Sequence, residues 1–205
     1  MTSTTPEKEL APKKPVIITN GFSPIPMSVE HLALVYRAAG FQVRIIEYRL
    51  EDMMDIKRYA KHIARTAREL HESTGHKAHI VGISMGGVAA LFGIKFYAAA
   101  PVVDTLVAMG SPFKGTPATF LGEWTLLFHK TGRQLAFRSE FIQKLHEDPL
   151  PPGPRYVSVS GHLDFVCPPY VSQLDGTDNR FLLFQHFHLI LSPLLHQQIA
   201  NILLE

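Results

Sequence analysis

Ser84 lies in the most informative stretch of the chain, residues 78–90, which reads AHIVGISMGGVAA. The residues before it are apolar and include β-branched types, which is typical of a buried strand, and an apolar helical pattern begins directly after it. A serine between Gly82 and Gly86 at such a junction occupies a strained turn that lifts its hydroxyl clear of the sheet. The glycines let strand and helix approach without side-chain clash. The pattern predicts a nucleophilic serine, and an ordinary glycine-flanked turn is the structural alternative.

A carboxylate and two histidines follow later predicted strands. Asp164 comes after the strand expected at residues 155–160, and His186 and His188 come after the one expected at residues 181–184. The carboxyl ends of parallel strands meet at one edge of a sheet, so we expect these groups to lie near the serine. A serine hydroxyl needs a base within hydrogen-bond reach to take its proton, and a carboxylate fixes the tautomer of that base. The chain order Ser, Asp, His is one in which this chemistry occurs.

Other groups of the chain are candidates for parts of the same chemistry. Asp175 and Asp178 lie in a glycine-containing stretch that is typical of a turn, so Asp164 is the preferred acid. The backbone N–H groups of Phe22, in a glycine-containing loop after the first strand, and of Met85, at the start of the helix after Ser84, are the expected donors to a tetrahedral oxyanion.

The elements that must position these residues alternate between strand and helix along the chain. Apolar or alternating segments predict six strands, at residues 16–19, 43–48, 78–83, 102–109, 155–160 and 181–184. Helical patterns between them predict an α/β protein with a central, mostly parallel sheet and helices on both faces. The helix that Asp55 caps carries Lys57, Arg58, Lys61, Arg65 and Arg68 on one face. We interpret that face as solvated, and contact with an anionic surface is the alternative.

Composition bounds the class of protein. The 205 residues are 46% hydrophobic and 19% charged, which suits one globular domain at residues 15–205 after a disordered tail at residues 1–14. A net charge of +2 without aromatic-basic clusters argues against nucleic acid as a partner. The chain shows no signal peptide and no transmembrane run, so a cytoplasmic location is expected, although a mature secreted form would look the same. No metal or cofactor site is predicted.

At these residues the chain resembles the lipase and esterase branch of the α/β-hydrolase family, and most closely the small bacterial triacylglycerol lipases. The motifs that carry the resemblance span nearly the whole of residues 15–205: Val81 to Gly87, Gly110 to Thr116, Asp164 to Pro169 and His188 to Pro193. Two positions depart from the usual family pattern. Asn20 stands where a histidine commonly precedes Gly21, and Ile83 stands where a histidine commonly precedes the nucleophile.

The resemblance implies a catalytic triad of Ser84, Asp164 and His188. From position alone, His186 competes with His188 for the role of base. The sequence Leu-Ile-Leu-Ser-Pro that follows His188 matches the family sequence after its catalytic histidine, so His188 is the preferred base.

A helical insert is expected near residues 112–148, close to the mouth of the site. Within it, Phe120, Trp124 and Phe128 recur at helical spacing. Either they pack the insert against the sheet, or Trp124 and Phe128 line a pocket for an acyl chain beneath a lid.

The sequence thus predicts a serine hydrolase that cleaves carboxylic esters of hydrophobic acyl chains through an acyl-enzyme on Ser84. Its partner would be a small-molecule or lipid ester. A thioesterase or acyltransferase would use the same triad, because the triad does not encode the leaving group or the acceptor. A hydrolase-fold binding protein without activity is the alternative from another class.

Overall fold

Six parallel strands form the centre of the molecule. The computed structural model describes residues 13–21, 29–46, 55–116 and 130–205. The strands are β1 (Pro15–Thr19), β2 (Gln42–Ile46), β3 (Ala78–Ile83), β4 (Val103–Met109), β5 (Arg155–Gly161) and β6 (Asp178–Leu182). They pair in parallel in the order β2-β1-β3-β4-β5-β6. The predicted fold class is confirmed, and the strand order reverses between β1 and β3, where ligands bind in open α/β sheets.

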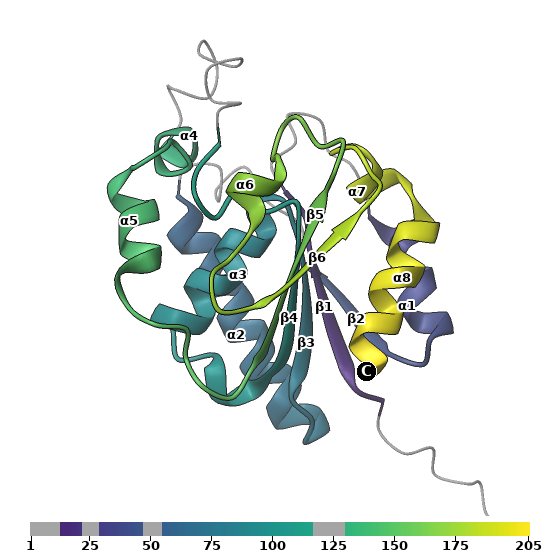
Figure 1. Cartoon of the computed structure of the whole chain (residues 1–205). Coiled ribbons are helices and arrows are strands. Elements are labelled where there is room, and N and C mark those ends of the chain that lie inside the picture. The colour runs from purple at the N-terminus through teal and green to yellow at the C-terminus, as the bar shows by residue number, and fades with distance from the viewer. Residues whose placement is uncertain (1–12, 22–28, 47–54, 117–129) are drawn as a thin grey trace, which may run out of the picture.

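Helices cover both faces of this sheet (Figure 1). The α-helices are α1 (Glu30–Ala38), α2 (Ile56–Thr74), α3 (Met85–Phe96), α4 (Lys130–Gln134), α5 (Glu140–Glu147), α6 (Pro169–Ser172), α7 (His188–Leu191) and α8 (Pro193–Leu204). Buried residues of α2, α3 and α5 form one core cluster with the sheet, and those of α1 and α8 form another on the opposite face. None of the helices in the described ranges is both long and apolar enough to cross a membrane.

The local sequence explains where α2, the helix that precedes β3, begins and ends. The carboxylate of Asp55 accepts a hydrogen bond from the backbone N–H of Lys57 and so caps α2. Gly75 ends the helix in the left-handed conformation, with φ of 71°. Because α2 buries one face and leaves the other charged, it packs on the sheet with a fixed orientation.

The last strand begins earlier than the sequence indicates. The apolar run at residues 181–184 predicted the strand, but β6 starts at Asp178 and ends at Leu182. An edge strand pairs on one side only and is partly exposed, so its polar first half needs no apolar pattern. This shift moves the end of the strand away from His188.

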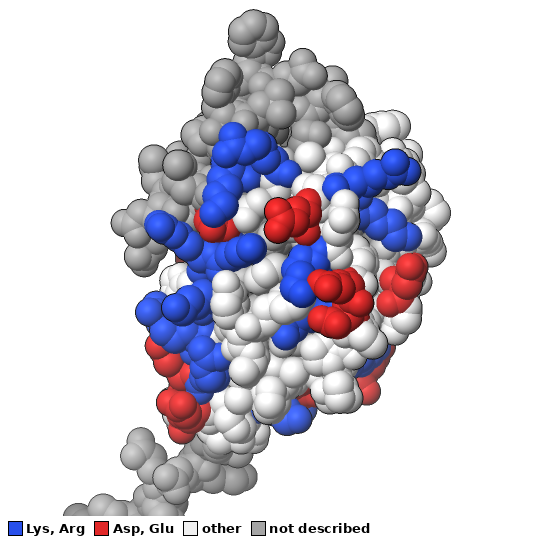
Figure 2. All heavy atoms as spheres, turned by 90° about the vertical axis from the view of Figure 1, so that its left-hand side faces the viewer, with Lys and Arg blue, Asp and Glu red and all other residues white. Residues whose placement is uncertain are grey.

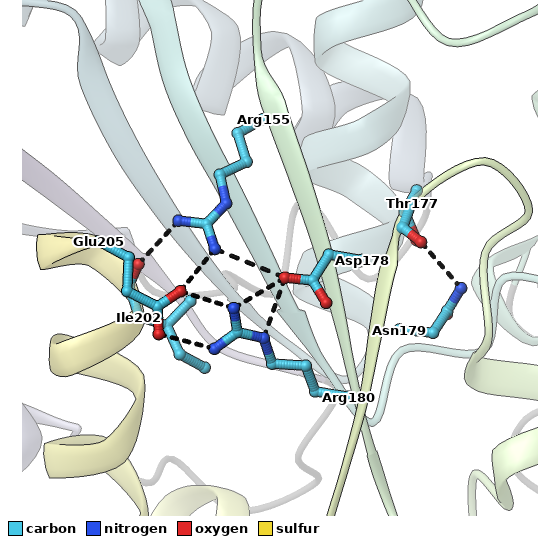
Figure 3. A network of polar contacts seen from close by, with 7 residues as sticks. All are labelled: Arg155, Thr177, Asp178, Asn179, Arg180, Ile202 and Glu205. Atoms are coloured by element: carbon cyan, nitrogen blue, oxygen red, sulfur yellow. Dashed lines mark hydrogen bonds and ion pairs between the residues drawn. The ribbon is translucent and has the colours of Figure 1, made fainter.

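Charged groups join β5, β6 and the end of α8 (Figure 3). Arg155 and Arg180 both donate to the Glu205 carboxylate, at 2.7 and 2.6 Å, and Arg180 also donates to Asp178 at 2.8 Å. Hydrogen bonds from Arg180 and then Arg155 lower the pKa of Glu205 to about 2. Asp178 is thus part of a surface network at the edge of the sheet, and α8 is fastened to the strand that leads to His186.

The predicted helical insert is described in part. Ser139 caps α5, and the buried Phe141, Ile142 and Leu145 join the core cluster that contains α3. Trp124 and Phe128, the predicted pocket residues, lie outside the described residues.

Candidate active site

Ser84 occupies a strained turn between β3 and α3. Its backbone has φ of 52° and ψ of −124°, a conformation that residues other than glycine rarely adopt. A Cβ on Gly82 would lie 2.4 Å from the Cα of Gly87, and one on Gly86 would lie 2.6 Å from the carbonyl oxygen of Thr19. Both positions therefore require glycine, as the sequence pattern predicts.

Ser84 belongs to a continuous chain of hydrogen-bonding groups with His186 and Asp164. The Oγ of Ser84 lies 3.0 Å from Nε2 of His186, and Nδ1 of His186 lies 2.8 Å from Oδ2 of Asp164. The other oxygen of Asp164 accepts from the backbone N–H groups of Val166 and Cys167, at 3.0 and 2.8 Å. With Asp164 at 2% exposure, the carboxylate is fixed by donors in one orientation. This geometry can move a proton from the serine to the imidazole.

The structure contradicts the choice of His188 as the base. His188 is exposed and is the first residue of α7, and its Nδ1 accepts a hydrogen bond from the backbone N–H of Gln185 at 3.0 Å. Because β6 ends at Leu182, the chain has already turned by residue 185, and His186 is the residue that points at the serine.

The loop that carries His186 is held from behind by α1 and α8. Nε2 of His196 donates to the carbonyl oxygen of Leu189 at 2.8 Å, so its Nδ1 must accept the bond from the Tyr36 hydroxyl at 2.7 Å. His31 donates to the carbonyl oxygen of Ile190 at 2.9 Å. Burial lowers the pKa of His196 to about 4, so the ring stays neutral at physiological pH.

The loop after β1 lies directly against the serine. A Cβ on Gly21 would lie 2.7 Å from the Cβ of Ser84 and 3.2 Å from its Oγ, so only glycine fits. The buried Tyr59 hydroxyl lies 2.9 Å from the carbonyl oxygen of Ile46 and 3.2 Å from that of Asn20, within donating distance of both. Of the predicted oxyanion donors, Phe22 lies outside the described residues. Met85 is in the first turn of α3, where backbone N–H groups lack helical acceptors.

Two residues of the site were not among the predicted site residues, although both lie in motifs that carry the family resemblance. Gly110 has φ of 53°, and a Cβ there would lie 3.0 Å from Oδ2 of Asp164 and 3.5 Å from Nδ1 of His186. Cys167 is buried beside Asp164, and its backbone N–H donates to Oδ1 of Asp164 at 2.8 Å. Burial, together with the charge of Asp164, raises the pKa of the Cys167 thiol. The contacts of Gly110 and Cys167 with Asp164 become visible only in the tertiary structure.

The chain was compared with protein-family models, with curated proteins and with solved structures. Neither the protein-family models nor the curated proteins include a match to the chain. Among solved structures, Bacillus licheniformis lipase BlEst2 in mature form is similar, with a TM-score of 0.79 at 16% identity over 98% of this chain and 96% of that one. Aspergillus fumigatus lipase B has a TM-score of 0.73 at 17% identity over 93% of this chain and 52% of that one, so this chain spans about half of it.

A third similar structure is MGS-MChE2, an alpha/beta hydrolase enzyme from a sediment metagenome of the Mar Chica lagoon, Morocco. Its TM-score is 0.62 at 20% identity, over 93% of this chain and 90% of that one. Together with the parallel sheet, these similarities show that the chain has the α/β-hydrolase fold and resembles lipases and esterases.

Proposed function

We propose that the protein is a serine hydrolase that cleaves carboxylic esters of hydrophobic acyl chains. Ser84 is the nucleophile, His186 is the general base and acid, and Asp164 holds the imidazole in the required tautomer. The observation that carries the proposal is the unbroken contact from Ser84 Oγ through His186 to the buried Asp164, at 3.0 and 2.8 Å. Nucleophile, base and orienting group within hydrogen-bond reach are the arrangement that acyl transfer requires.

In this mechanism His186 takes the proton of Ser84 as the oxygen attacks the ester carbonyl. The oxyanion forms at the amino end of α3, where the backbone N–H of Met85 donates to it, and the backbone N–H of Phe22 is the proposed second donor. His186 then protonates the leaving alcohol, and the acyl group remains on Ser84. Water, deprotonated by the same histidine, attacks the acyl-enzyme and releases the acid. Asp164 accepts the hydrogen bond from Nδ1 of His186 throughout and stabilises the imidazolium.

The preference for apolar acyl chains is supported by side chains next to the site in sequence. Phe165 follows Asp164 and is 81% exposed, and Phe187 follows His186 and is 68% exposed. Large apolar side chains in water beside a polar site favour an apolar ligand. Two similar solved structures carry the name lipase, which agrees with this substrate class. Trp124 and Phe128 remain proposed as further contacts of the acyl chain.

A fluorophosphonate probe tests whether the site is catalytic. We expect one label per chain and none in Ser84→Ala. Absence of labelling, or labelling that persists in Ser84→Ala, would refute the nucleophile and favour a binding protein. A panel of p-nitrophenyl esters and acyl-CoA thioesters, assayed with and without alcohol acceptors, then separates an esterase from a thioesterase or acyltransferase. Faster turnover of the thioesters, or transfer to the alcohol in preference to water, would replace the ester-hydrolase assignment.

A further inference from the structure

Away from Ser84, a hollow lies on the outer face of the helices that cover one side of the sheet. It has a volume of about 590 Å³ and is bordered by residues of α2, α3, α4 and α5 and of the segments next to them. Ser84, Asp164 and His186 are not among its lining residues. Figure 2 shows this side of the molecule, where Lys and Arg side chains gather over α2 and α4. We call the cavity of about 590 Å³ on this side the basic hollow.

Aromatic rings form one wall of the basic hollow. Phe92 and Phe141 stack with centroids 4.9 Å apart and an interplanar angle of 13°, and Phe96 lies 4.5 Å from Phe92. Phe96 and Tyr97 at the end of α3 are only partly buried, so their rings border the open space. Such a wall favours a ligand with a flat apolar body.

Cationic side chains form the rim of the basic hollow. Lys57, Lys130, Arg133 and Lys144 line it, against a single carboxylate, that of Glu140. Lys130 pairs with Asp55 and Lys144 with Glu147, which lie outside the lining. Lys57 makes no ion pair with any residue in the part of the chain that the structure describes; its Nζ lies 6.0 Å from the centre of the Phe92 ring.

The neutral polar groups of the hollow are already engaged. The amide of Gln134 donates to Asp55 and accepts from the backbone N–H of Ile56. The hydroxyl of Ser139 donates to the carbonyl oxygen of Gln134 and accepts from the N–H of Ile142. Among the described lining residues, the ammonium group of Lys57 is therefore the donor best placed to meet a ligand, and an ammonium group selects anions.

We propose that the basic hollow binds a small organic anion that carries an aromatic ring, either a carboxylate or a phosphate monoester. The ring packs against Phe96 and Tyr97, and the anionic group meets the ammonium group of Lys57. This site is separate from the ester-cleaving site and does not depend on the triad.

Isothermal titration of the full chain at low ionic strength tests the proposal with four probes. 1-Naphthyl phosphate and 1-naphthoate carry both ring and charge, 1-naphthol carries only the ring, and inorganic phosphate carries only the charge. We expect at least one of the two anionic naphthyl probes to bind with one-to-one stoichiometry, and both single-feature probes to bind about tenfold more weakly or not at all. The tighter of the two anionic probes identifies the anionic group that the hollow prefers.

Variants locate the binding. Lys57→Glu should weaken the anionic naphthyl probes by about tenfold, because it reverses a charge at the rim. The matched control is Lys61→Glu, on the next turn of the same helix and outside the lining, which should change binding by less than about twofold. Phe96→Leu should weaken the naphthyl probes and leave phosphate unchanged.

Any of three results would overturn the proposal: no binding of either anionic naphthyl probe at millimolar concentration, equal binding of 1-naphthol, or equal losses in Lys57→Glu and Lys61→Glu. Thermal unfolding of each variant accompanies the titrations. If Lys57→Glu does not fold, Lys57→Gln and Lys61→Gln make the same comparison by removing the charge instead of reversing it.

Discussion

Acid should destabilise the protein through His196. Its side chain is fully buried, where its ring links the Tyr36 hydroxyl to the carbonyl oxygen of Leu189, and burial lowers its pKa from 6.5 to about 4. Protonation would place a charge among apolar side chains of α1 and α8 and would oppose the positive charge of a protonated His31, which also lowers the pKa.

The direction and size of the effect follow from linkage. Above about pH 6.5 the ring is neutral in both the folded and the unfolded state. Below about pH 6.5 the imidazole is protonated in the unfolded chain, whereas in the folded chain it stays neutral down to about pH 4. The unfolded state is therefore stabilised relative to the folded state, and the free energy of unfolding falls. Each pH unit in that window costs about 1.4 kcal/mol, which makes His196 responsible for about 2 kcal/mol of lost stability between about pH 7 and pH 4.5.

Urea unfolding at the two pH values measures this loss. We expect the difference in the free energy of unfolding between pH 7 and 4.5 to be smaller in His196→Gln than in the wild type by about 2 kcal/mol. The comparison cancels the contribution of His79, whose pKa burial also lowers. Tyr36→Phe is the matched control: it removes the hydroxyl that donates to Nδ1 but leaves the imidazole buried, and burial is the main cause of the low pKa, so it should retain most of the wild-type pH dependence. If wild type and His196→Gln lose the same free energy on acidification, the assignment to His196 is wrong.

Two further substitutions probe the support of the site. Tyr59→Phe removes the hydroxyl near the Asn20 carbonyl, 3.2 Å away, and should lower kcat about tenfold with KM unchanged, because the loop against the serine loosens; a KM effect alone would contradict this role. Gly110→Ala should cost about 1–2 kcal/mol of stability, because φ is 53°, and should lower kcat, because the new Cβ meets Asp164. Gly176→Ala is the control: its φ is 76° and no atom lies within 4 Å of the new Cβ, so it should lose similar stability and keep its activity. Equal kcat values in the two glycine variants would contradict the packing argument.

The fold could be predicted because the strands of the sheet and the helices that cover it each have a characteristic pattern of apolar residues in the sequence. Buried parallel strands such as β3 are continuous apolar runs, and helices such as α2 carry an apolar stripe between a cap and a glycine stop. Ser84 could be predicted for the same reason, since a strained turn flanked by close-packed backbone demands glycine on both sides. Asp164 follows from the end of β5, which the sequence predicts to within one residue.

The base could not be fixed from the sequence, because its identity depends on where an edge strand ends. The half-exposed β6 lacks the apolar run that marks a buried strand, and two histidines stand within three residues of each other. A turn at Gln185, where the backbone N–H donates to Nδ1 of His188, leaves His186 facing Ser84, and the spacing of the two histidines does not reveal that turn.

The central claim is that His186, and not His188, is the base for Ser84. The most direct test is the steady-state hydrolysis of a short-chain p-nitrophenyl ester by His186→Ala and His188→Ala, with both variants shown to be folded by thermal unfolding. The predicted result is a fall in kcat of about 10³-fold or more for His186→Ala, and a change within about fivefold for the exposed His188→Ala. A large loss in His188→Ala together with near-normal turnover in His186→Ala would contradict the account.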